Sequence, residues 1–426
     1  TYIDDIIKGM ELLQHRGQDG CGIAYTDSYN NLITERGSGL VKDVFTNSIK
    51  KLTCDKCIGH VRYSTSSKSK ENKSLIKDEC QPIYGQSNLG EFYLVHNGNI
   101  PNVDGHDTQK IVEFLEQLED DSWDNKLIKL METIPAAYCI LIITKTHLYA
   151  LRDRFGIRPL CIGKDNNSFC ISSESCALHK HQYLCDINPG EIISINNEGI
   201  KKIYKYKNAK LSICALEFIY FMKPNSFSDG YYVSDVRYKM GIMLAKNETL
   251  KVTNYLIVGV PETGIISAQG YANELKAKYM QIITKNKNMH RTFILPDDNQ
   301  RTVACSNKFN FDSKKINGSK IIIIDDSLVR GNVMKSIIRK LWDLGAIEIH
   351  VRISSPPIIS TCQFGIDIPS KHELFIHKKS YIDIINELSV TSIRYFKYKD
   401  LDKVLPPCSY KECFGETVID SMYWVR

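Results

Sequence analysis

The sequence predicts two domains of different fold class, an α+β domain in the first half of the chain and an α/β domain in the second. The 426 residues exceed what one hydrophobic core usually organises. Many short apolar strands with few helices in the first half predict stacked antiparallel sheets. Buried strands that alternate with amphipathic helices in the second half predict a doubly wound parallel sheet.

The composition is that of a globular protein. Hydrophobic residues make up 43% of the chain and charged residues 24%, no apolar run approaches transmembrane length, and the first residues resemble a helix rather than a signal peptide. We therefore expect a cytoplasmic protein without a membrane partner, with organelle targeting left untested. The net charge of +6 comes from scattered lysines without an aromatic-interleaved basic stripe, which favours anionic substrates such as phosphates over nucleic acid.

Fourteen cysteines are scattered through apparent strands and do not resemble the framework of a small secreted protein. Reduced thiols, some of them metal-bound, are therefore favoured over disulfides. Cys54 and Cys57 have a metal-like spacing but no second pair of that spacing, and we interpret them as structural. A zinc site shared with Cys408 and Cys413 is the alternative.

Residues 320–332 are predicted to form the centre of the second domain. Four consecutive isoleucines predict a strand buried on both faces, and Asp325 and Asp326 end it. Ser327-Leu-Val-Arg-Gly331 and an amphipathic helix follow. A strand, a tight polar loop and a helix start form an anion cradle, where carboxylates suit ribose hydroxyls or a hydrated Mg²⁺. A plain strand with an acidic turn would explain the isoleucines but not this polar run.

A second buried strand is predicted at residues 255–261, with Thr263 just after it and a helix from residue 265 to about residue 276. A further strand is predicted near residues 347–354. Such units place their active site at the carboxyl ends of the strands.

The sequence from Asp325 to Gly331 resembles the signature of type I phosphoribosyltransferases that binds phosphoribosylpyrophosphate (PRPP). The resemblance implies that five residues bind PRPP: Asp325, Asp326, Ser327, Arg330 and Gly331. It also implies that Mg²⁺ and pyrophosphate lie near Thr263 and the two aspartates. Asn332-Val333 replaces a hydroxyl-bearing pair of the family, so weaker PRPP affinity is expected.

Residues 283–293 are basic, follow a strand and resemble the flexible loop that closes over PRPP in such enzymes. The resemblance implies that Lys285 and Arg291 neutralise pyrophosphate as it leaves and that closure excludes water. His290 stands where the family has a glycine, which is expected to stiffen the loop or alter its path. On composition alone, a solvated basic loop is the alternative.

The first half carries short motifs that are ordinary when each is taken singly. Arg62 suits a surface arginine, Asn97-Gly98 suits a hairpin turn, and Asp107 suits a helix cap. The motifs in chain order are Gln14-His-Arg-Gly-Gln18, His60-Val-Arg-Tyr-Ser-Thr65, His96-Asn-Gly-Asn99, Asp107 before a helix, and Arg152-Asp-Arg-Phe-Gly-Ile-Arg-Pro-Leu160.

This order resembles that of class II glutamine amidotransferase domains, which are N-terminal-nucleophile hydrolases of αββα fold, and the match covers residues 1–205. The resemblance implies L-glutamine as substrate. Arg62 would bind its α-carboxylate through a bidentate pair, with Thr65 in the same site, and Asp107 would bind its α-ammonium. The side chain of Asn97 and the N–H of Gly98 would form the oxyanion hole.

The nucleophile of that family is an N-terminal cysteine on a strand before the first helix. Thr1 already lies in the first predicted helix, so strand and cysteine are expected ahead of it, and the chain as given is expected not to hydrolyse glutamine. Thr1 lacks the strand that would place it beside Asn97, and Cys21 has no free amine.

The sequence from Ile213 to Ser226 resembles the inter-domain segment of glutamine phosphoribosylpyrophosphate amidotransferases, although its Tyr-Phe-Met-Lys-Pro run also suits a core strand ended by proline. We place four segments accordingly: an amidotransferase domain at 1–205, an inter-domain segment at 206–235, a phosphoribosyltransferase domain at 236–395 and a C-terminal segment at 396–426.

Some members of that family hold a [4Fe–4S] cluster on four cysteines. Cys214, Cys362, Cys408 and Cys413 match the order of these ligands along the chain. The last pair has a Cys-x₄-Cys spacing where the family has Cys-x₂-Cys, so the resemblance leaves the cluster open.

The expected function is that of this amidotransferase family, the first step of de novo purine (IMP) biosynthesis. Ammonia from glutamine would pass through an internal channel and displace pyrophosphate from C1 of PRPP, giving 5-phosphoribosylamine and glutamate. Purine nucleotides are expected inhibitors, and a homo-oligomer is expected. Two alternatives are a phosphoribosyltransferase that uses free ammonia only and a non-catalytic sensor of PRPP or nucleotides; a sensor would not need the basic loop and the glutamine-site residues.

Overall fold

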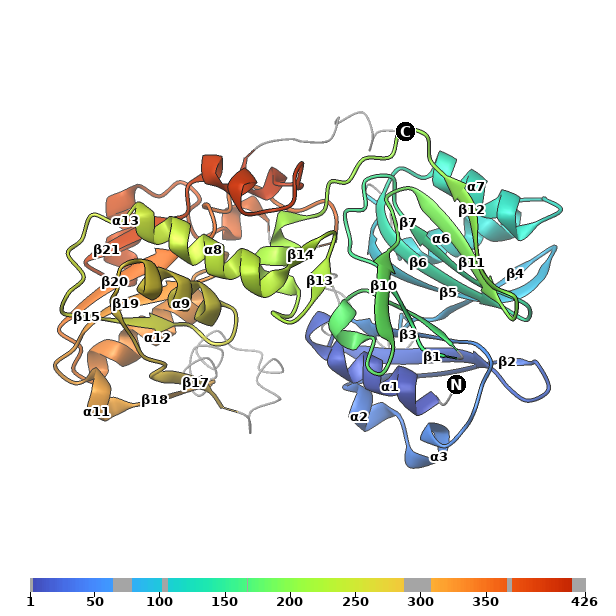
Figure 1. Cartoon of the computed structure of the whole chain (residues 1–426), viewed down its shortest axis with the longest axis horizontal. Helices are drawn as coiled ribbons and strands as arrows, with labels where there is room; N and C mark the ends of the chain where they lie inside the picture. The colour runs from blue at the N-terminus through green and yellow to red at the C-terminus, as the bar shows by residue number, and fades with distance from the viewer. Residues whose placement is uncertain are drawn as a thin grey trace.

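The computed structural model describes residues 3–63, 79–101, 106–166, 168–286, 308–365 and 370–415. In Figure 1 the first half of the chain, coloured blue to green, forms one layered lobe, and the second half, coloured yellow to red, forms another. Helix α8 (Val233–Lys246) runs from the junction along the second lobe.

The first lobe is built on a six-stranded antiparallel sheet in the order β12-β11-β7-β6-β5-β4. Alternating apolar residues bury both faces of its central strands. The strands are β4 (Ile83–Ser87), β5 (Gly90–Asn99), β6 (Ala137–Thr144), β7 (Leu148–Arg152), β11 (Glu191–Asn196) and β12 (Gly199–Lys205).

Two three-stranded antiparallel sheets accompany it, in the orders β2-β1-β3 and β10-β8-β9. Ala24 and Ile58 of the first pack against Val95 and Ile143 of the six-stranded sheet. The β2-β1-β3 sheet and the six-stranded sheet therefore stack face to face, as the sequence predicts. Their strands are β1 (Gly20–Thr26), β2 (Leu32–Ser38), β3 (Cys57–Arg62), β8 (Cys161–Lys164), β9 (Phe169–Ser172) and β10 (Gln182–Asp186).

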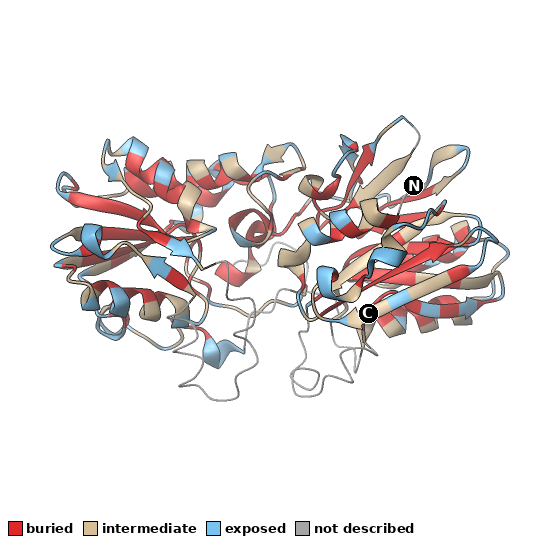
Figure 2. Cartoon of the chain, turned by 90° about the horizontal axis from the view of Figure 1, so that it is seen from below, coloured by how far each residue is buried: buried red, intermediate tan, exposed pale blue. Residues whose placement is uncertain are grey.

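Helices cover the outer faces of these sheets. The apolar stripes of α6 (Asp107–Gln117) and α7 (Trp123–Thr133) pack on the six-stranded sheet. The buried face of α1 (Ile3–Leu12) packs on β1 and β3. The lobe is thus a helix, sheet, sheet, helix sandwich whose buried residues lie along the strands in Figure 2.

The second lobe is built on a parallel sheet in the order β16-β15-β19-β20-β21. Strand β19 (Lys320–Asp325) lies at its centre, with Ile321 and Ile323 in one hydrophobic cluster and Ile322 and Ile324 in another. The expectation of a strand buried on both faces is confirmed. The other strands are β15 (Tyr255–Gly259), β16 (Lys278–Tyr279), β20 (Glu348–Ile353) and β21 (Ser392–Tyr395).

Helices α8 and α9 (Gly264–Glu274) cover one face of this sheet, and α12 (Asn332–Asp343) and α13 (Tyr381–Leu388) cover the other. Short elements complete the chain. They are α2 (Val41–Val44), α3 (Asn47–Lys50), α11 (Ser313–Ile316), β13 (Phe227–Ser228), β14 (Tyr231–Tyr232), β17 (Ile283–Lys285), β18 (Phe309–Phe311), η1 (Gln14–Arg16), η2 (Ser175–Ala177), η3 (Glu217–Phe221), η5 (Lys371–Glu373), η6 (Tyr398–Lys403) and η7 (Glu412–Phe414).

Over the described ranges, no helix is both long and apolar enough to cross a membrane.

In two segments, side chains satisfy the backbone in place of a neighbouring strand. Residues 154–160 form a loop, since the carboxylate of Asp153 accepts the N–H groups of Phe155 and Ile157. Residues 217–221 form a π-helix and not a core strand, because Arg237 of α8 donates to the carbonyls around its end.

The expectation of a hairpin turn at Asn97-Gly98 is wrong. Strand β5 stays paired with β6 through Asn97, Gly98 and Asn99, which oppose Cys139, Tyr138 and Ala137. The dipeptide therefore lies in a strand and not in a tight turn.

Candidate active sites

Arg62 ends strand β3 and is only 7% exposed. Its Nη1 donates to the carbonyl of Glu79 at 2.6 Å and lies 3.2 Å from Nε2 of His106, and its Nη2 donates to the carboxylate of Glu79. Its Nε is buried without a hydrogen-bond partner among the described residues. A carboxylate of the chain itself thus holds the guanidinium that the resemblance assigns to the α-carboxylate of glutamine.

Asn97 and Gly98 lie near the carboxyl end of β5. The Nδ2 group of Asn97 is buried and has no hydrogen-bond partner within the described ranges. A Cβ on Gly98 would lie 1.9 Å from the carbonyl oxygen of Ala137, so only glycine fits between β5 and β6 here. An unsatisfied buried donor of this kind suits an acceptor that arrives with a ligand.

Asp107 begins helix α6 and faces the same strand end. Its Oδ1 accepts the N–H of Thr108 at 2.7 Å, its Oδ2 accepts the N–H of Ile100 at 3.3 Å, and Nδ1 of His96 lies 3.6 Å away. The carboxylate therefore bridges the end of β5 and the start of α6, beside Asn97.

Three histidines in this region are held neutral. Burial, together with the charge of Arg62, lowers the pKa of His60 to about 3. Burial also lowers the pKa values of His96 and His106. Near neutral pH these rings act as neutral hydrogen-bonding groups, so the cationic partner for an anionic ligand here is Arg62.

Two buried thiols of the first lobe, Cys139 and Cys21, are not activated nucleophiles. Cys139 opposes Asn97 across the sheet and is buried, which raises its pKa above the ordinary range. Burial raises the pKa of Cys21 to about 12. A reactive cysteine needs the opposite shift, because the thiolate is the nucleophile.

Asp325 and Asp326 meet at the carboxyl end of β19. Asp326 accepts hydrogen bonds from the hydroxyls of Thr263 and Ser327, the latter at 2.5 Å. Burial and the neighbouring charge of Asp326 raise the pKa of Asp325 well above its ordinary value. The parallel register of β15 and β19 brings Thr263 here, since Gly259 and Ile324 are opposite each other near the strand ends.

The start of helix α12 shapes the loop that follows the acidic pair. Gly331 has a φ of +79°, and a Cβ there would lie 2.4 Å from the ring of Phe375. Arg330 is half-exposed, and its Nε lies 3.2 Å from the carboxylate of Glu373.

Cationic side chains lie at the edge of this site. The Nζ of Lys285 lies 3.9 Å from the carboxylate of Glu262, which directly precedes Thr263. The charge of Lys308 acts on Asp325 and lowers its pKa, against the effect of burial. Thr65, His290 and Arg291, which the sequence also assigns to these sites, lie outside the described residues.

The acidic pair fits a hydrated divalent cation. Two adjacent carboxylates with a hydroxyl are the oxygen donors that Mg²⁺ accepts, and buried like charges favour a cation between them. Within the described ranges no three His, Cys, Asp or Glu side chains are grouped to hold a metal. Water and substrate oxygens would have to complete the shell.

Three of the four predicted cluster cysteines lie together. The pKa values of Cys214 and Cys413 are raised by burial and by the charges of their cysteine neighbours, and Cys362 acts on both. The N–H of Phe364 lies 3.3 Å from Sγ of Cys362. Cys408 is exposed. The described side chains therefore do not form a four-thiolate cage.

The comparisons with known proteins agree with this division into two sites. A sequence family described as a glutamine amidotransferase domain matches residues 69–180. The amidophosphoribosyltransferase of Archaeoglobus fulgidus is 32% identical, over 96% of this chain and 92% of its own. That of Methanocaldococcus jannaschii is 34% identical, over 94% of this chain and 90% of its own.

Solved structures match over nearly the whole chain. Glutamine phosphoribosylpyrophosphate amidotransferase from Bacillus subtilis, complexed with ADP and GMP, superposes with a TM-score of 0.86 at 31% identity, covering 96% of this chain and 93% of its own. A structure of the allosteric regulatory enzyme of purine biosynthesis gives the same TM-score and identity, covering 96% and 92%.

The fold and the two sites define an enzyme class, in which a glutamine amidotransferase domain of N-terminal-nucleophile type is joined to a parallel sheet of phosphoribosyltransferase type. The chain belongs to the amidophosphoribosyltransferase family. Enzymes of this family catalyse the first step of purine biosynthesis.

Sequence reasoning missed several residues that the structure brings to these sites. Glu79 and Lys308 belong to no motif, and nothing in the sequence distinguishes them from surface charges. His60 and His96 lie inside sequence motifs, but the sequence predicts no role for them because their neutral state depends on burial. Glu217, bound by arginines from distant segments, has no sequence signal.

Proposed function

We propose that the residues described above form the glutamine site and the PRPP site of an amidophosphoribosyltransferase, with the nucleophile of the glutamine half supplied by a residue that is not among them. The observation that supports this most directly is the acidic pair at the end of β19 with Thr263, Lys285 and Lys308 around it, because it unites a cation site with pyrophosphate-neutralising charge.

In the glutamine half, Arg62 binds the α-carboxylate and Asp107 binds the α-ammonium, with Thr65 completing the substrate site. The buried Nδ2 of Asn97 and the N–H of Gly98 donate to the oxyanion that forms when the amide carbon is attacked. The Nδ2 group of Asn97 can donate without rearrangement of the site, because it is already buried and has no hydrogen-bond partner among the described residues.

The attacking thiolate is proposed to come from an N-terminal cysteine, as the resemblance to N-terminal-nucleophile hydrolases implies. Cys21 and Cys139 do not suit this role, since burial raises their pKa values. Joining the native upstream residues to this chain should confer glutamine hydrolysis, and replacing their cysteine with alanine should remove it.

In the phosphoribosyl half, Asp325 and Asp326 orient the ribose hydroxyls. With Thr263 they would hold Mg²⁺, which would neutralise pyrophosphate charge. Ser327, Arg330 and Gly331 bind the 5′-phosphate at the start of α12. Ammonia forms a bond to C1 as the bond from C1 to pyrophosphate breaks. Lys285 and Arg291 stabilise the leaving pyrophosphate.

The same proposal includes domain limits at residues 205, 235 and 395. It also includes a cytoplasmic location, a homo-oligomeric state and inhibition by purine nucleotides. The relative from B. subtilis was solved with ADP and GMP, which supports nucleotide regulators.

A [4Fe–4S] cluster on Cys214, Cys362, Cys408 and Cys413 stays a prediction from the family. Iron and acid-labile sulfide in equal amounts in anaerobically purified protein would support it. Their absence would leave the cysteines as packed thiols of the hydrophobic cluster that contains Cys214 and Cys413.

The central test is pyrophosphate release from PRPP and Mg²⁺ with ammonium chloride or with glutamine as the nitrogen source. Ammonia should support release, and Asp326→Asn should reduce the rate at least about a hundredfold because it removes a cation ligand. Glutamine should support release only in protein that carries the upstream cysteine.

The same assay separates the two alternatives. If the upstream cysteine is present and glutamine still gives no release, the ammonia-only enzyme is favoured. If neither nitrogen source gives release while PRPP binds, the sensor is favoured.

A further inference from the structure

The loop that leads into strand β3 carries two cysteines in direct contact, Cys54 and Cys57. Cys54 is 6% exposed and belongs to the hydrophobic cluster that α1 shares with β1, and the partly buried Cys57 packs against the same cluster. The two side chains are hydrogen-bonded to each other, and both are present as thiols. The sequence gives only their spacing, whereas the fold brings the two sulfur atoms together.

Backbone contacts anchor the loop on both sides of this pair. The carbonyl of Leu52 accepts the N–H of Ile3 at 3.1 Å, and the carbonyl of Lys56 accepts the N–H of Thr26 at 3.1 Å. The N–H of Lys56 also lies 3.3 Å from Oγ1 of Thr26. Strand β3 begins at the next residue, Cys57. A bond between the two sulfur atoms would therefore join groups that the fold already holds together, without a shift of β3.

The surroundings of the pair suit thiol oxidation better than metal binding. Within the part of the chain that the structure describes, no third His, Cys, Asp or Glu is grouped with them to hold a metal. Cys413 belongs to a different hydrophobic cluster, which does not support a zinc site shared with it. Thr53 and Asp55 are exposed, so a small oxidant can reach the loop from solvent.

Cys54 is the thiol of the pair that is prepared for attack. The hydrogen bond from Cys57 lowers the pKa of Cys54, and the charge of Lys56 acts in the same direction, whereas burial opposes them. The same hydrogen bond and burial raise the pKa of Cys57, so Cys57 keeps its proton. Burial raises the pKa values of Cys21 and Cys80, which are less suited to react because the thiolate is the nucleophile.

We propose that Cys54 and Cys57 form a modification site at which hydrogen peroxide produces a reversible disulfide that stabilises the first lobe. The Cys54 thiolate attacks one peroxide oxygen, the O–O bond breaks, and the leaving hydroxide takes up a proton to become water. Cys54 is then a sulfenic acid. The sulfur of Cys57 attacks the sulfur of Cys54, the S–O bond breaks, and hydroxide leaves with the Cys57 proton as a second water. The two thiols lose two electrons, which the peroxide gains.

A disulfide here would stabilise the strand that carries the glutamine-site arginine. Arg62 ends β3, which begins at Cys57. The new bond would remove conformational freedom from the unfolded chain, and the folded chain would gain little strain because the sulfur atoms are already in contact. Dithiols such as dithiothreitol would reverse the bond by thiol–disulfide exchange. Disulfides of cytosolic proteins are usually of this transient kind.

The test locates the bond by mass spectrometry of the whole chain. Trypsin cuts after Lys51, Lys56 and Arg62, so Cys54 and Cys57 fall in separate peptides, residues 52–56 and residues 57–62. The reduced protein is treated with hydrogen peroxide, its remaining thiols are blocked with iodoacetamide, and it is digested without reductant. We expect the two peptides to be recovered linked to each other, and to separate when dithiothreitol is added before digestion.

Single-cysteine variants separate the two steps. Cys57→Ser should hold Cys54 as a sulfenic acid, which dimedone labels, because the second thiol is absent. Cys54→Ser should leave Cys57 unlabelled at the same peroxide concentration. Cys185 is the control within the chain, since it is exposed but burial of its surroundings and nearby acidic charges raise its pKa. Dimedone should label it much less than Cys54.

Thermal unfolding measures the stabilising effect. The oxidised parent should unfold about 2–5 °C above the reduced parent, because the closed loop restricts the unfolded chain. Cys57→Ser treated in the same way should show no such rise.

The inference is overturned if peptides 52–56 and 57–62 are never linked, if Cys185 is labelled as strongly as Cys54, or if oxidation does not raise the unfolding temperature. These measurements involve neither glutamine nor PRPP. The inference therefore does not rest on the proposed function, and each can fail without the other.

Discussion

At the scale of single residues, Arg62 already holds a carboxylate of its own chain. Glutamine must displace Glu79 before its α-carboxylate can reach the guanidinium. We expect Glu79→Gln to tighten L-glutamate binding by roughly three- to fivefold, since a partly exposed ion pair contributes up to about 1 kcal/mol. Calorimetry measures the Kd directly.

Glu91→Gln is the control for this prediction, because Glu91 pairs with Lys145 at 3.0 Å and is not part of the site. An unchanged Kd in Glu79→Gln would show that Glu79 does not compete with the substrate.

A second single-residue prediction concerns Gly331. Gly331 and Gly318 both have positive φ, +79° and +74°, but a Cβ on Gly331 would strike Phe375 while one on Gly318 meets open space. Gly318→Ala should cost about 1–2 kcal/mol of unfolding free energy from backbone strain alone. Gly331→Ala should cost more and should also weaken PRPP binding. Equal costs from chemical denaturation, with equal PRPP Kd values, would contradict this.

At the scale of elements, β19 ends in two buried carboxylates that PRPP binding requires but whose burial lowers the stability of the fold. The folded-state pKa of Asp325 is raised above its unfolded value, so its contribution to stability is full below about pH 3.9 and is lost as the pH rises through the folded pKa. Asp325→Asn should therefore melt at a higher temperature than the parent near pH 7, and the difference should vanish near pH 4.

PRPP binding with Mg²⁺ should be lost in Asp325→Asn, which separates function from stability. Asp312→Asn is the control, because Lys315 lowers the pKa of the partly exposed Asp312 and no gain in melting temperature is expected there. A lower melting temperature for Asp325→Asn at pH 7 would show that the carboxylate is not a source of instability.

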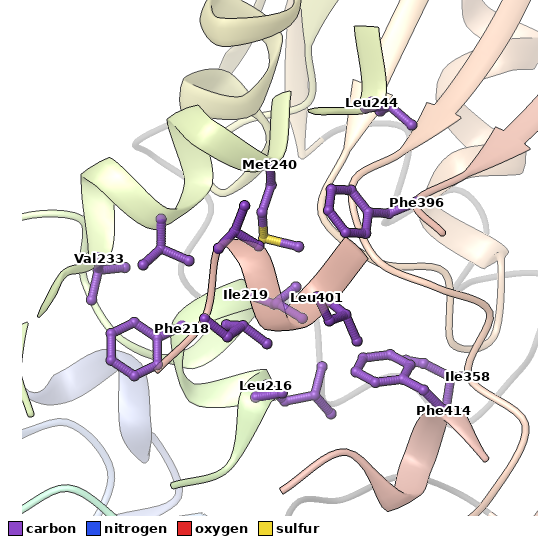
Figure 3. Close-up of a cluster of buried hydrophobic side chains, with 14 of the residues drawn as sticks. Leu216, Phe218, Ile219, Val233, Met240, Leu244, Ile358, Phe396, Leu401 and Phe414 are labelled. Carbon is purple, nitrogen blue, oxygen red and sulfur yellow. The ribbon is translucent and has the colours of Figure 1, made fainter. Parts of the chain in front are cut away.

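At the scale of the whole molecule, one hydrophobic cluster joins both lobes. It contains Ala137 and Ile157 of the first lobe, Phe218 of the junction, and Ile322 of the parallel sheet, and Figure 3 shows the part around Phe218. Phe218→Ala should cost about 3–5 kcal/mol by leaving a cavity. In this variant, the temperature at which L-glutamate binding is lost and the temperature at which PRPP binding is lost should fall by the same amount.

Phe92→Ala provides the contrast, since Phe92 is fully buried in a cluster confined to the first lobe. It should lower the temperature at which L-glutamate binding is lost more than that for PRPP. Two separate transitions in Phe218→Ala would mean that the shared cluster does not couple the lobes.

The parts of the sites that lie within one motif could be predicted from sequence. Consecutive isoleucines predict a strand buried on both faces that ends at Asp325 and Asp326, because local pattern determines such a strand. The Asn-Gly pair at Asn97 predicts a turn that does not form, because strand pairing with β6 outweighs its turn preference. Its unsatisfied donor follows from packing and not from residue type.

The two fold classes, the family and the acidic PRPP signature can be predicted without a structure, since they depend on local periodicity and on residues adjacent in the chain. Tertiary contacts are needed to show that Glu79 pairs with Arg62, that Arg237 binds the carbonyls of the π-turn at residues 217–221, and that Glu217 joins Arg16 to Arg158. Each of these contacts links side chains tens to hundreds of positions apart or depends on burial. Charge pairing and desolvation arise from three-dimensional proximity, which no local pattern encodes.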